Sequence, residues 1–256
     1  MPSDTKPAAG NACAVVVGAG ARAGIGGALC ARFAAAGLPV YAVGRTAQKL
    51  EALAAEIRGA GGTAIPVVAD VAKPEEVKAL FGRIGAEGRA PELVAFNAAL
   101  ANVPTSLAAT TPEFVEERWR VCCLAGFLVG QEAIARMLPQ KRGTLIFTGA
   151  TASLRGKPQF AAFAAAKAGL RAFAQAMARE CGPKGIHVAH VVVDGVVDGD
   201  RVASFGHGVG KAFLLTKGSD GALKPDAVAE SYWQLHLQQR SAWTHELDLR
   251  PFKEEF

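Results

Sequence analysis

The feature that most constrains this chain is a set of closely spaced glycines between an apolar run and a helical pattern. Gly20, Gly24 and Gly26 follow the run Ala12–Val17 and open a segment with Leu29 on its inner face. Glycines at this place permit a tight turn, a close approach of the backbone to a pyrophosphate, and close packing of helix against strand. The free N–H groups at the start of the following helix also favour phosphate. The sequence therefore predicts a strand–turn–helix unit that binds a dinucleotide.

Short apolar runs alternate with helical patterns along the chain. Continuously hydrophobic runs are typical of strands that are buried on both faces of a parallel sheet, and they occur at Ala12–Val17, Val40–Val43, Ala64–Val68, Leu93–Phe96, Thr144–Phe147 and His187–Val193. A further strand element is expected in the tail at Glu246–Leu249. Proline followed by an acid, which suits a first helical turn, marks three helix starts at Pro74-Glu75, Pro112-Glu113 and Pro225-Asp226. We expect an α/β fold with a single Rossmann-type doubly wound parallel sheet of about seven strands and helices on both faces.

Residues 1–256 read as one nucleotide-binding domain with one irregular segment, residues 198–224, which contains six glycines. A glycine-rich stretch of this length inside a compact domain is typical of a functional lid, so we expect a lid loop over the substrate. The alternative is a disordered surface insertion. Phe213 and Leu215 favour the lid, because apolar side chains of this size are expected to be buried.

Composition excludes several classes of protein. Half of the residues are apolar and 20% are charged, which excludes intrinsic disorder. The net charge of +5 comes without a long basic run, so we expect a small-molecule substrate and no nucleic-acid partner. The longest apolar stretches are interrupted by charges, so we expect no membrane span. The five cysteines lack metal-binding spacing, which predicts no metal site and a cytoplasmic location.

The end of the second strand bears on which dinucleotide is bound. Dinucleotide folds that select NAD place an acidic residue there for the ribose diol, whereas this chain has Gly44-Arg45. Arg45 offers a planar cation that suits a 2′-phosphate, and Arg22 in the glycine turn offers a second one. The alternative is two solvated arginines. We expect NADP (NADPH) as the cofactor rather than NAD.

Further motifs occur after the third and fourth strands and on a later helix. They are Asp70-Val71, Asn97-Ala98-Ala99 and Lys167, and with the spacing Gly20-xxx-Gly24-x-Gly26 they resemble the short-chain dehydrogenase/reductase family over about residues 12–200. Polar groups just past the carboxyl ends of parallel strands lie where open α/β sheets bind ligands. Taken singly, Asp70 is also a candidate helix cap and Asn97 a candidate turn residue. The resemblance implies an NAD(P)-dependent oxidoreductase.

The resemblance also implies roles for individual residues. Asp70 is expected to bond the adenine amine, Asn97 to lie by the ribose, and Lys167 to bind the nicotinamide ribose hydroxyls. The full set of expected cofactor contacts is Gly20, Arg22, Gly24, Ile25, Gly26, Arg45, Asp70, Val71, Asn97, Ala98, Lys167 and Val197. The helices around residues 112–138 and 160–181 resemble those through which the family assembles, which implies a homo-oligomer, either a dimer or a tetramer.

At the catalytic positions the chain departs from the family pattern. The family places a Tyr four residues before the Lys and a Ser thirteen residues before that Tyr, but this chain has Phe163 and Ala150 there. Thr151 is the nearest candidate hydroxyl to compensate. The helix Asn of the family corresponds to Cys122, with Cys123 as the neighbouring option. We expect the catalytic region to comprise Lys167, Thr151 and Phe163.

The missing phenol and serine favour a substrate that needs no proton at its reacting atom. One positioned acid or base contributes about 10²–10⁴ in rate, so a ketone is expected to react slowly here. A protonated C=N compound already carries its charge, and we hypothesise NADPH-dependent hydride transfer to a small C=O or C=N substrate, iminium-like substrates above all. Asp194, His207 and Lys167 are candidate replacement donors; the alternatives are a capping aspartate, a surface loop histidine and a lysine that only holds the ribose. The alternative is an NADPH-binding pseudoenzyme with a regulatory or assembly role.

Overall fold

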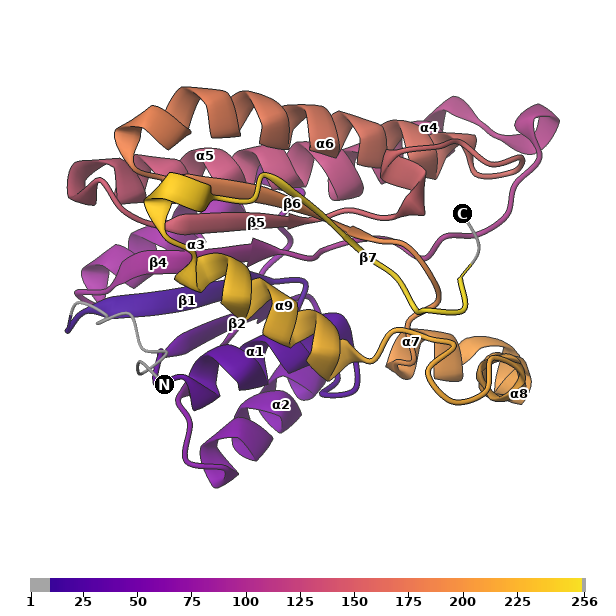
Figure 1. Ribbon diagram of the computed structural model, residues 1–256, viewed down its shortest axis with the longest axis horizontal. Coiled ribbons are helices and arrows are strands. Elements are labelled where there is room, and N and C mark those ends of the chain that lie inside the picture. The colour runs from indigo at the N-terminus through magenta and orange to yellow at the C-terminus, as the bar shows by residue number, and fades with distance from the viewer. Residues whose placement is uncertain (1–9, 255–256) are drawn as a thin grey trace.

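The computed structural model describes residues 10–254, which form one seven-stranded sheet (Figure 1). All neighbouring strands are parallel, in the order β3-β2-β1-β4-β5-β6-β7. The strands are β1 (Ala12–Val17), β2 (Val40–Gly44), β3 (Ala64–Val68), β4 (Ala90–Phe96), β5 (Thr144–Thr148), β6 (His187–Val193) and β7 (Glu246–Leu249). The predicted fold class is confirmed, and each strand begins and ends within three residues of its predicted bounds.

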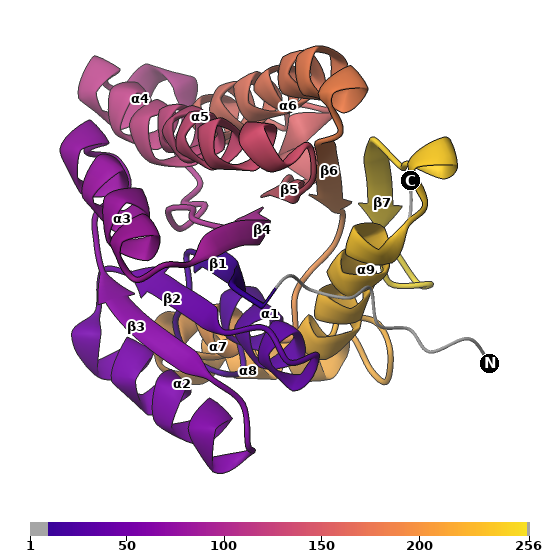
Figure 2. The same ribbon diagram turned by 90° about the vertical axis from the view of Figure 1, so that its left-hand side faces the viewer.

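Helices cover both faces of the sheet (Figure 2). One face carries α1 (Ile25–Ala35), α2 (Ala47–Gly59) and α9 (Pro225–Leu237), and the other carries α3 (Pro74–Ala86), α4 (Pro112–Trp119), α5 (Ala125–Met137) and α6 (Ala161–Cys181). The helices α3, α4 and α9 begin at the predicted prolines. Short helical elements are η1 (Leu107–Ala109), η3 (Leu138–Gln140), η4 (Thr151–Ser153), η5 (Gly182–Lys184) and η7 (Arg240–Ala242).

The inner strands are largely apolar because each face of the sheet is covered, whereas the edge strand β7 has the sequence Glu-Leu-Asp-Leu. In β1, Val15 and Val17 pack into the cluster that contains α3, α5 and α6, while Ala14 and Val16 pack into the cluster with α1 and α9. Successive side chains of a strand point to opposite faces, so a strand with helices on both sides needs apolar residues at every position. The two cores hold the carboxyl ends of the strands in fixed positions.

One helical run is long and apolar enough to match a membrane span by length and composition. It comprises α4, the π-helix η2 (Arg120–Leu124), α5 and η3, from Pro112 to Gln140. In this fold 44% of its most apolar window is buried, and the run packs against α6 and β4. The core helix of a globular domain passes the same test, so the expectation of no membrane association stays a prediction.

The segment 198–224 is helical, which corrects the prediction of a lid loop. It contains α7 (Asp200–Ala203), η6 (Phe205–Gly208) and α8 (Val209–Thr216), and a parallel bridge joins Val197 to Leu223 at its base. Figure 1 shows α7 and α8 at one end of the molecule, beside the start of α9. The expected burial of its apolar side chains is wrong as well, because Phe213 is 44% and Leu215 77% exposed.

Candidate active site

The turn between β1 and α1 leaves no room for side chains at two of its glycines. Gly18 has a φ of +88°, and a Cβ there would lie 2.5 Å from the backbone nitrogen of Ala98, after β4. A Cβ on Gly26 would lie 2.2 Å from the carbonyl oxygen of Gly18. Gly20, by contrast, has no atom within 4 Å of its Cβ position. The turn thus presents bare backbone to open space at the start of α1, an arrangement that accepts a phosphate.

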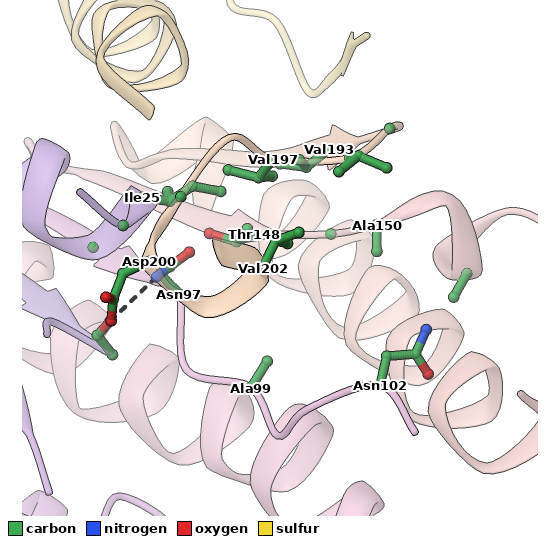
Figure 3. A pocket seen from close by; sticks show the side chains of 18 of the residues that line it. Ile25, Asn97, Ala99, Asn102, Thr148, Ala150, Val193, Val197, Asp200 and Val202 are labelled. Atoms are coloured by element: carbon green, nitrogen blue, oxygen red, sulfur yellow. Dashed lines mark hydrogen bonds between the residues drawn. The ribbon is translucent and has the colours of Figure 1, made fainter. Parts of the chain in front are cut away.

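A cavity of about 900 Å³ opens beside this turn, at the carboxyl ends of β1, β4, β5 and β6 (Figure 3). Cavities of about 300–1,000 Å³ are typical of cofactor and small-molecule sites, so this one has room for a dinucleotide. Nine of the residues predicted for the site line it, namely Gly20, Gly24, Ile25, Gly26, Asn97, Thr151, Phe163, Lys167 and Val197. The size of the cavity and the bare glycine turn together fit a nicotinamide dinucleotide.

The other predicted contacts do not line the cavity, and they are Arg22, Arg45, Asp70, Val71 and Ala98. The guanidinium of Arg22 pairs with Asp226 at 2.8 Å. The Asp70 carboxylate accepts a hydrogen bond from the N–H of Ala72 at 3.1 Å, and the Asp70 N–H donates to Glu76 at 2.7 Å. Asp70 therefore shapes the turn before α3 but does not cap that helix, whose N-cap residue is Lys73. Contacts of these residues with a cofactor stay predictions.

The end of β2 has no space for an acidic side chain. A Cβ on Gly44 would lie 2.6 Å from the carbonyl oxygen of Ala19 in the glycine turn. That oxygen belongs to the backbone, so an added side chain would displace the turn itself. Arg45 follows on the exposed surface. The absence of an acid at this place therefore has a steric cause.

Asn97 joins the loop after β4 to the glycine turn. Its N–H donates to the carbonyl oxygen of Val17 at 2.8 Å, and its side-chain Nδ2 donates to the carbonyl oxygen of Gly18 at 3.2 Å. Asn97 also lines the cavity. It therefore fixes two strand ends to each other and forms part of the cavity wall between them (Figure 3).

Lys167 and Phe163 lie one turn apart on α6 and face the end of β5. Lys167 is 3% exposed, and its Nζ donates a hydrogen bond to the carbonyl oxygen of Thr148 at 2.8 Å. The Phe163 ring centre lies 5.8 Å from that Nζ. Phenylalanine has no donor or acceptor, so this part of the wall cannot exchange a proton with a ligand.

The π-helix η2 carries two adjacent buried cysteines beside this lysine. The pKa of the Cys123 thiol is raised to about 11. Burial is the main cause, Cys122 adds to it, and the Lys167 charge opposes it. A Cβ on Gly169 of α6 would lie 2.8 Å from the Cys123 Sγ. Cys123, the neighbouring option, is therefore a residue that faces α6, and the correspondence of Cys122 with the family's Asn stays a prediction. Both thiols are buried.

Thr151 and Asp194 form one hydrogen-bonded cluster that corrects two expectations. The Thr151 hydroxyl donates to the Asp194 carboxylate at 2.5 Å, so its proton is directed away from the cavity. Arg155 and Arg250 contact the same carboxylate at 2.8 and 3.2 Å. Burial opposes ionisation, but the Thr151 hydrogen bond and the two guanidinium charges outweigh it and lower the pKa of Asp194. Asp194 is thus an ionised anchor and not a proton donor, and Thr151 does not compensate for the missing serine as a donor.

His190 is a buried core histidine of β6. Its Nδ1 lies 3.0 Å from the carboxylate of Glu246. Burial lowers the pKa of His190 to about 4, although the Glu246 charge raises it, so the ring is neutral at pH 7. The side chain of His207, the candidate donor in the lid, lies outside the described residues. Among the described residues, no cluster of three His, Cys, Asp or Glu side chains is placed to hold a metal ion.

The cavity is also lined by four charged residues that the sequence analysis did not single out, namely Lys49, Arg155, Lys157 and Asp200. The Nζ of Lys49 lies 3.3 Å from the Asp200 carboxylate, and this pair joins α2 to α7. The Asp200 N–H also donates to the carbonyl oxygen of Ala23 at 3.2 Å. Spacing along the chain gives no signal for such a long-range pair; for Arg155 the position shortly after β5 is the only signal.

Comparison with known proteins adds a family to this geometry. The sequence model for short chain dehydrogenases matches residues 13–208. An uncharacterized oxidoreductase of Bacillus subtilis is 30% identical over 223 residues, 83% of this chain. The chain spans 30% of that protein's length and 54% of that of a short chain dehydrogenase from Pseudocercospora fijiensis.

Solved structures match over nearly their whole length. The crystal structure of a short-chain dehydrogenase from Rhodopseudomonas palustris has a TM-score of 0.80 and 40% identity, over 94% of this chain and 99% of that one. A metagenomic short-chain oxidoreductase in complex with NADP has a TM-score of 0.77 and 25% identity, over 93% of this chain and 96% of that one. The overall fold is therefore shared with known structures of short-chain dehydrogenases and oxidoreductases.

Proposed function

Because this chain belongs to the short-chain dehydrogenase family, we propose that it is an NADPH-dependent reductase that transfers hydride to a small C=O or C=N compound. The observation that carries the proposal is the cavity wall around Lys167. The wall keeps the glycine turn and the lysine, yet it has Phe163 and Ala150 where the family places its Tyr and Ser. A site of this kind favours a substrate that is activated before it binds.

The choice of NADPH is supported at the end of β2. An acid at position 44 would overlap the carbonyl oxygen of Ala19, so the ribose diol of NAD lacks its usual partner. The exposed guanidinium of Arg45 suits a 2′-phosphate, which Arg binds in a bidentate manner. The metagenomic oxidoreductase similar to this chain contains NADP. Bound NADPH supplies the hydride.

The chain's own residues would bind and orient the cofactor and shield the reacting atom from water. The bare backbone at Gly20 and the start of α1 would hold the pyrophosphate, and Asn97 and Val197 lie along the path from there to Lys167. The hydrogen bond to Thr148 fixes the Lys167 ammonium at the end of β5, where the ribose hydroxyls are expected. The apolar side chains of Phe163 and Ala150 exclude water from the reacting atom.

Thr151 offers no hydroxyl proton to a substrate. Its hydroxyl donates to Asp194, so the Thr151 oxygen has lone pairs, and no proton, for a group in the cavity. An N–H on a protonated C=N group matches a lone pair, whereas a ketone oxygen would meet an acceptor without a proton. Electrostatic matching therefore favours an iminium over a ketone at this position.

Turnover measured on a matched panel tests the proposal. The purified full chain is mixed with NADPH and with 2-methylpyrroline, cyclopentanone or pentanal, and NADPH oxidation is followed by absorbance. We expect turnover of the imine at least about tenfold above that of the ketone. Lys167→Met serves as the control that loses this turnover while it stays folded by circular dichroism.

Two results would overturn the proposal. Turnover of the ketone as fast as that of the imine would show that an acid replaces the missing phenol. No turnover with any substrate, while NADPH binds in a fluorescence titration, would show that the chain is not a reductase of these compounds. We also propose that the protein acts as a homo-oligomer in the cytoplasm, which gel filtration with light scattering and fractionation of its host cells test.

A further inference from the structure

The charged side chains that line the cavity are unequal in sign. Among the described lining residues, Lys49, Arg155, Lys157 and Lys167 are cationic, and Asp200 is the one carboxylate. Asp200 pairs with Lys49 at 3.3 Å, so these two charges offset each other. The remaining potential is positive, and a cleft lined by one sign of charge concentrates ligands of the opposite sign.

Lys157 differs from the other three cations because no described residue pairs with its ammonium. It lies in the turn between η4 and α6, where its carbonyl oxygen accepts a hydrogen bond from the Phe160 N–H at 3.2 Å. Pro158 follows and restricts the backbone of Lys157 to extended conformations. The side chain is exposed and also lines the cavity, so its charge lies where the cavity meets solvent.

Arg155, two residues earlier, presents a second cation with donors to spare. Its Nη2 donates to the Asp194 carboxylate at 2.8 Å, which holds the guanidinium in place. A guanidinium has five N–H donors, and this side chain is 40% exposed. The turn from Arg155 to Lys157 therefore offers two positive groups on one short, anchored segment.

The lining also contains large apolar side chains, which are Phe160, Phe163, Val193, Val202 and Phe213. In Figure 3, Val202 of the lid projects toward the end of β5 at Thr148 and Ala150. Apolar walls with a few placed polar groups are typical of sites that recognise a small molecule by its shape and one charged end. A cation without a partner beside such an apolar wall is complemented by a ligand that has an anionic group on an apolar body.

We propose that the substrate carries a carboxylate that binds Lys157 and the free N–H groups of Arg155, while its apolar body packs against Phe160 and Phe213. This inference rests on the proposed function, because it names the substrate class of the same cavity. Lys157 and Arg155 are specificity-determining residues and take no part in hydride transfer. The substrate class is a C=N or C=O compound with an anionic end.

Binding of a matched pair of probes tests this without turnover. The full chain is saturated with NADP⁺, and phenylacetate or its neutral analogue phenylacetamide is titrated in by calorimetry. We expect phenylacetate to bind more tightly than phenylacetamide. Lys157→Met is expected to weaken the binding of phenylacetate about three- to tenfold, because a charge-assisted hydrogen bond is lost at a partly exposed site. The affinity for phenylacetamide is expected to stay unchanged.

Three controls make the result specific. Lys211→Met removes an exposed lysine of α8 that does not line the cavity, and it is expected to change neither affinity. Lys157→Arg restores the charge and is expected to restore phenylacetate binding. Raising the salt concentration weakens an exposed ion pair, so it is expected to lower the affinity for phenylacetate and not that for phenylacetamide.

Equal binding of the two probes, or equal loss of both in Lys157→Met, would overturn the proposal. Phosphate that displaces phenylacetate in competition, with phenylacetate itself weaker than phenylphosphate, would also overturn it and assign the cations to a phosphorylated substrate. Failure of the proposed function is seen separately, as a lack of NADPH oxidation with the imine, ketone and aldehyde panel. The carboxylate test stands on binding alone.

Discussion

The carboxylate of Asp194 binds two residues that line the cavity, Thr151 and Arg155, and its removal is expected to destabilise the protein. Its side chain is 2% exposed and lies 2.8 Å from the guanidinium of Arg155 and 3.2 Å from that of Arg250. Removal of one partner from a buried ion pair costs about 3–5 kcal/mol, because the other charge stays buried. Arg155 regains water, so we expect the lower end, about 3 kcal/mol, for Asp194→Ala.

Urea denaturation at pH 7, followed by circular dichroism, measures this loss as a difference in the free energy of unfolding. In thermal unfolding about 3 kcal/mol corresponds to a Tm lower by about 6–12 °C for a chain of this size. The matched control is Asp248→Ala. Asp248 is the other acidic partner of Arg250 but is 37% exposed, so its loss is expected to cost less than about 1 kcal/mol.

The pH dependence gives a second check with a fixed sign. Burial works against ionisation, but Thr151 and the two arginines outweigh it and lower the pKa of Asp194. A carboxyl whose folded pKa lies below its unfolded value, about 3.9 for Asp, stabilises the fold above that pH and ceases to do so as it is protonated. The difference between wild type and Asp194→Ala is therefore expected to shrink below about pH 4. A loss under about 1 kcal/mol at pH 7, or one that grows as the pH falls, would refute the reasoning.

Three further predictions concern the cavity. Phe163→Tyr restores a phenol near Lys167 and is expected to raise ketone reduction by about 10²-fold, measured as NADPH oxidation, whereas Phe163→Leu has no such effect. Gly44→Asp is expected to weaken both NADPH and NADH in fluorescence titrations, because its Cβ would meet the Ala19 carbonyl oxygen at 2.6 Å; tighter NADH binding would contradict this. Lys49→Met breaks an exposed ion pair, so faster hydrogen exchange in α7 is expected with a stability change below about 1 kcal/mol; unchanged exchange would show that the pair does not hold the lid.

Most of the sheet could be predicted from sequence because its strands have helices on both sides. A run such as His187–Val193 must be apolar at nearly every position when both faces are covered, so its bounds show directly in the residue types. The right-handed crossover that parallel neighbours require fixes the hand of each connection, whereas the order of the strands is known from the structure. Residues 198–224 were harder to predict: η6 contains Gly206 and Gly208, α8 contains Gly210, and glycine lowers helix propensity, so the segment reads as a loop.

The cavity was predictable in part, and the division has a physical cause. The residues that line it from the glycine turn, such as Gly20, follow a strand directly, so their position is set by the sheet. The partners of Thr151 and Asp194 are not visible in the sequence, because Arg250 comes 56 residues after Asp194 and meets it only through β7. Local patterns report periodicity and caps, while the pKa of a buried acid depends on which charges the fold brings to it.

The Asp194 cluster changes what the missing catalytic groups imply. The sequence alone left Thr151 and Asp194 as candidate donors, which would have allowed ordinary ketone chemistry. In the structure the two side chains bind each other: the Thr151 hydroxyl donates its hydrogen bond to the Asp194 carboxylate, which two arginines keep ionised. Neither has a proton to give near neutral pH, so neither replaces the missing phenol and serine as the acid that a ketone needs. A substrate that arrives already protonated is the chemical counterpart of such a wall, and the same arginine that fixes Asp194 turns its remaining donors toward the anionic end of that substrate.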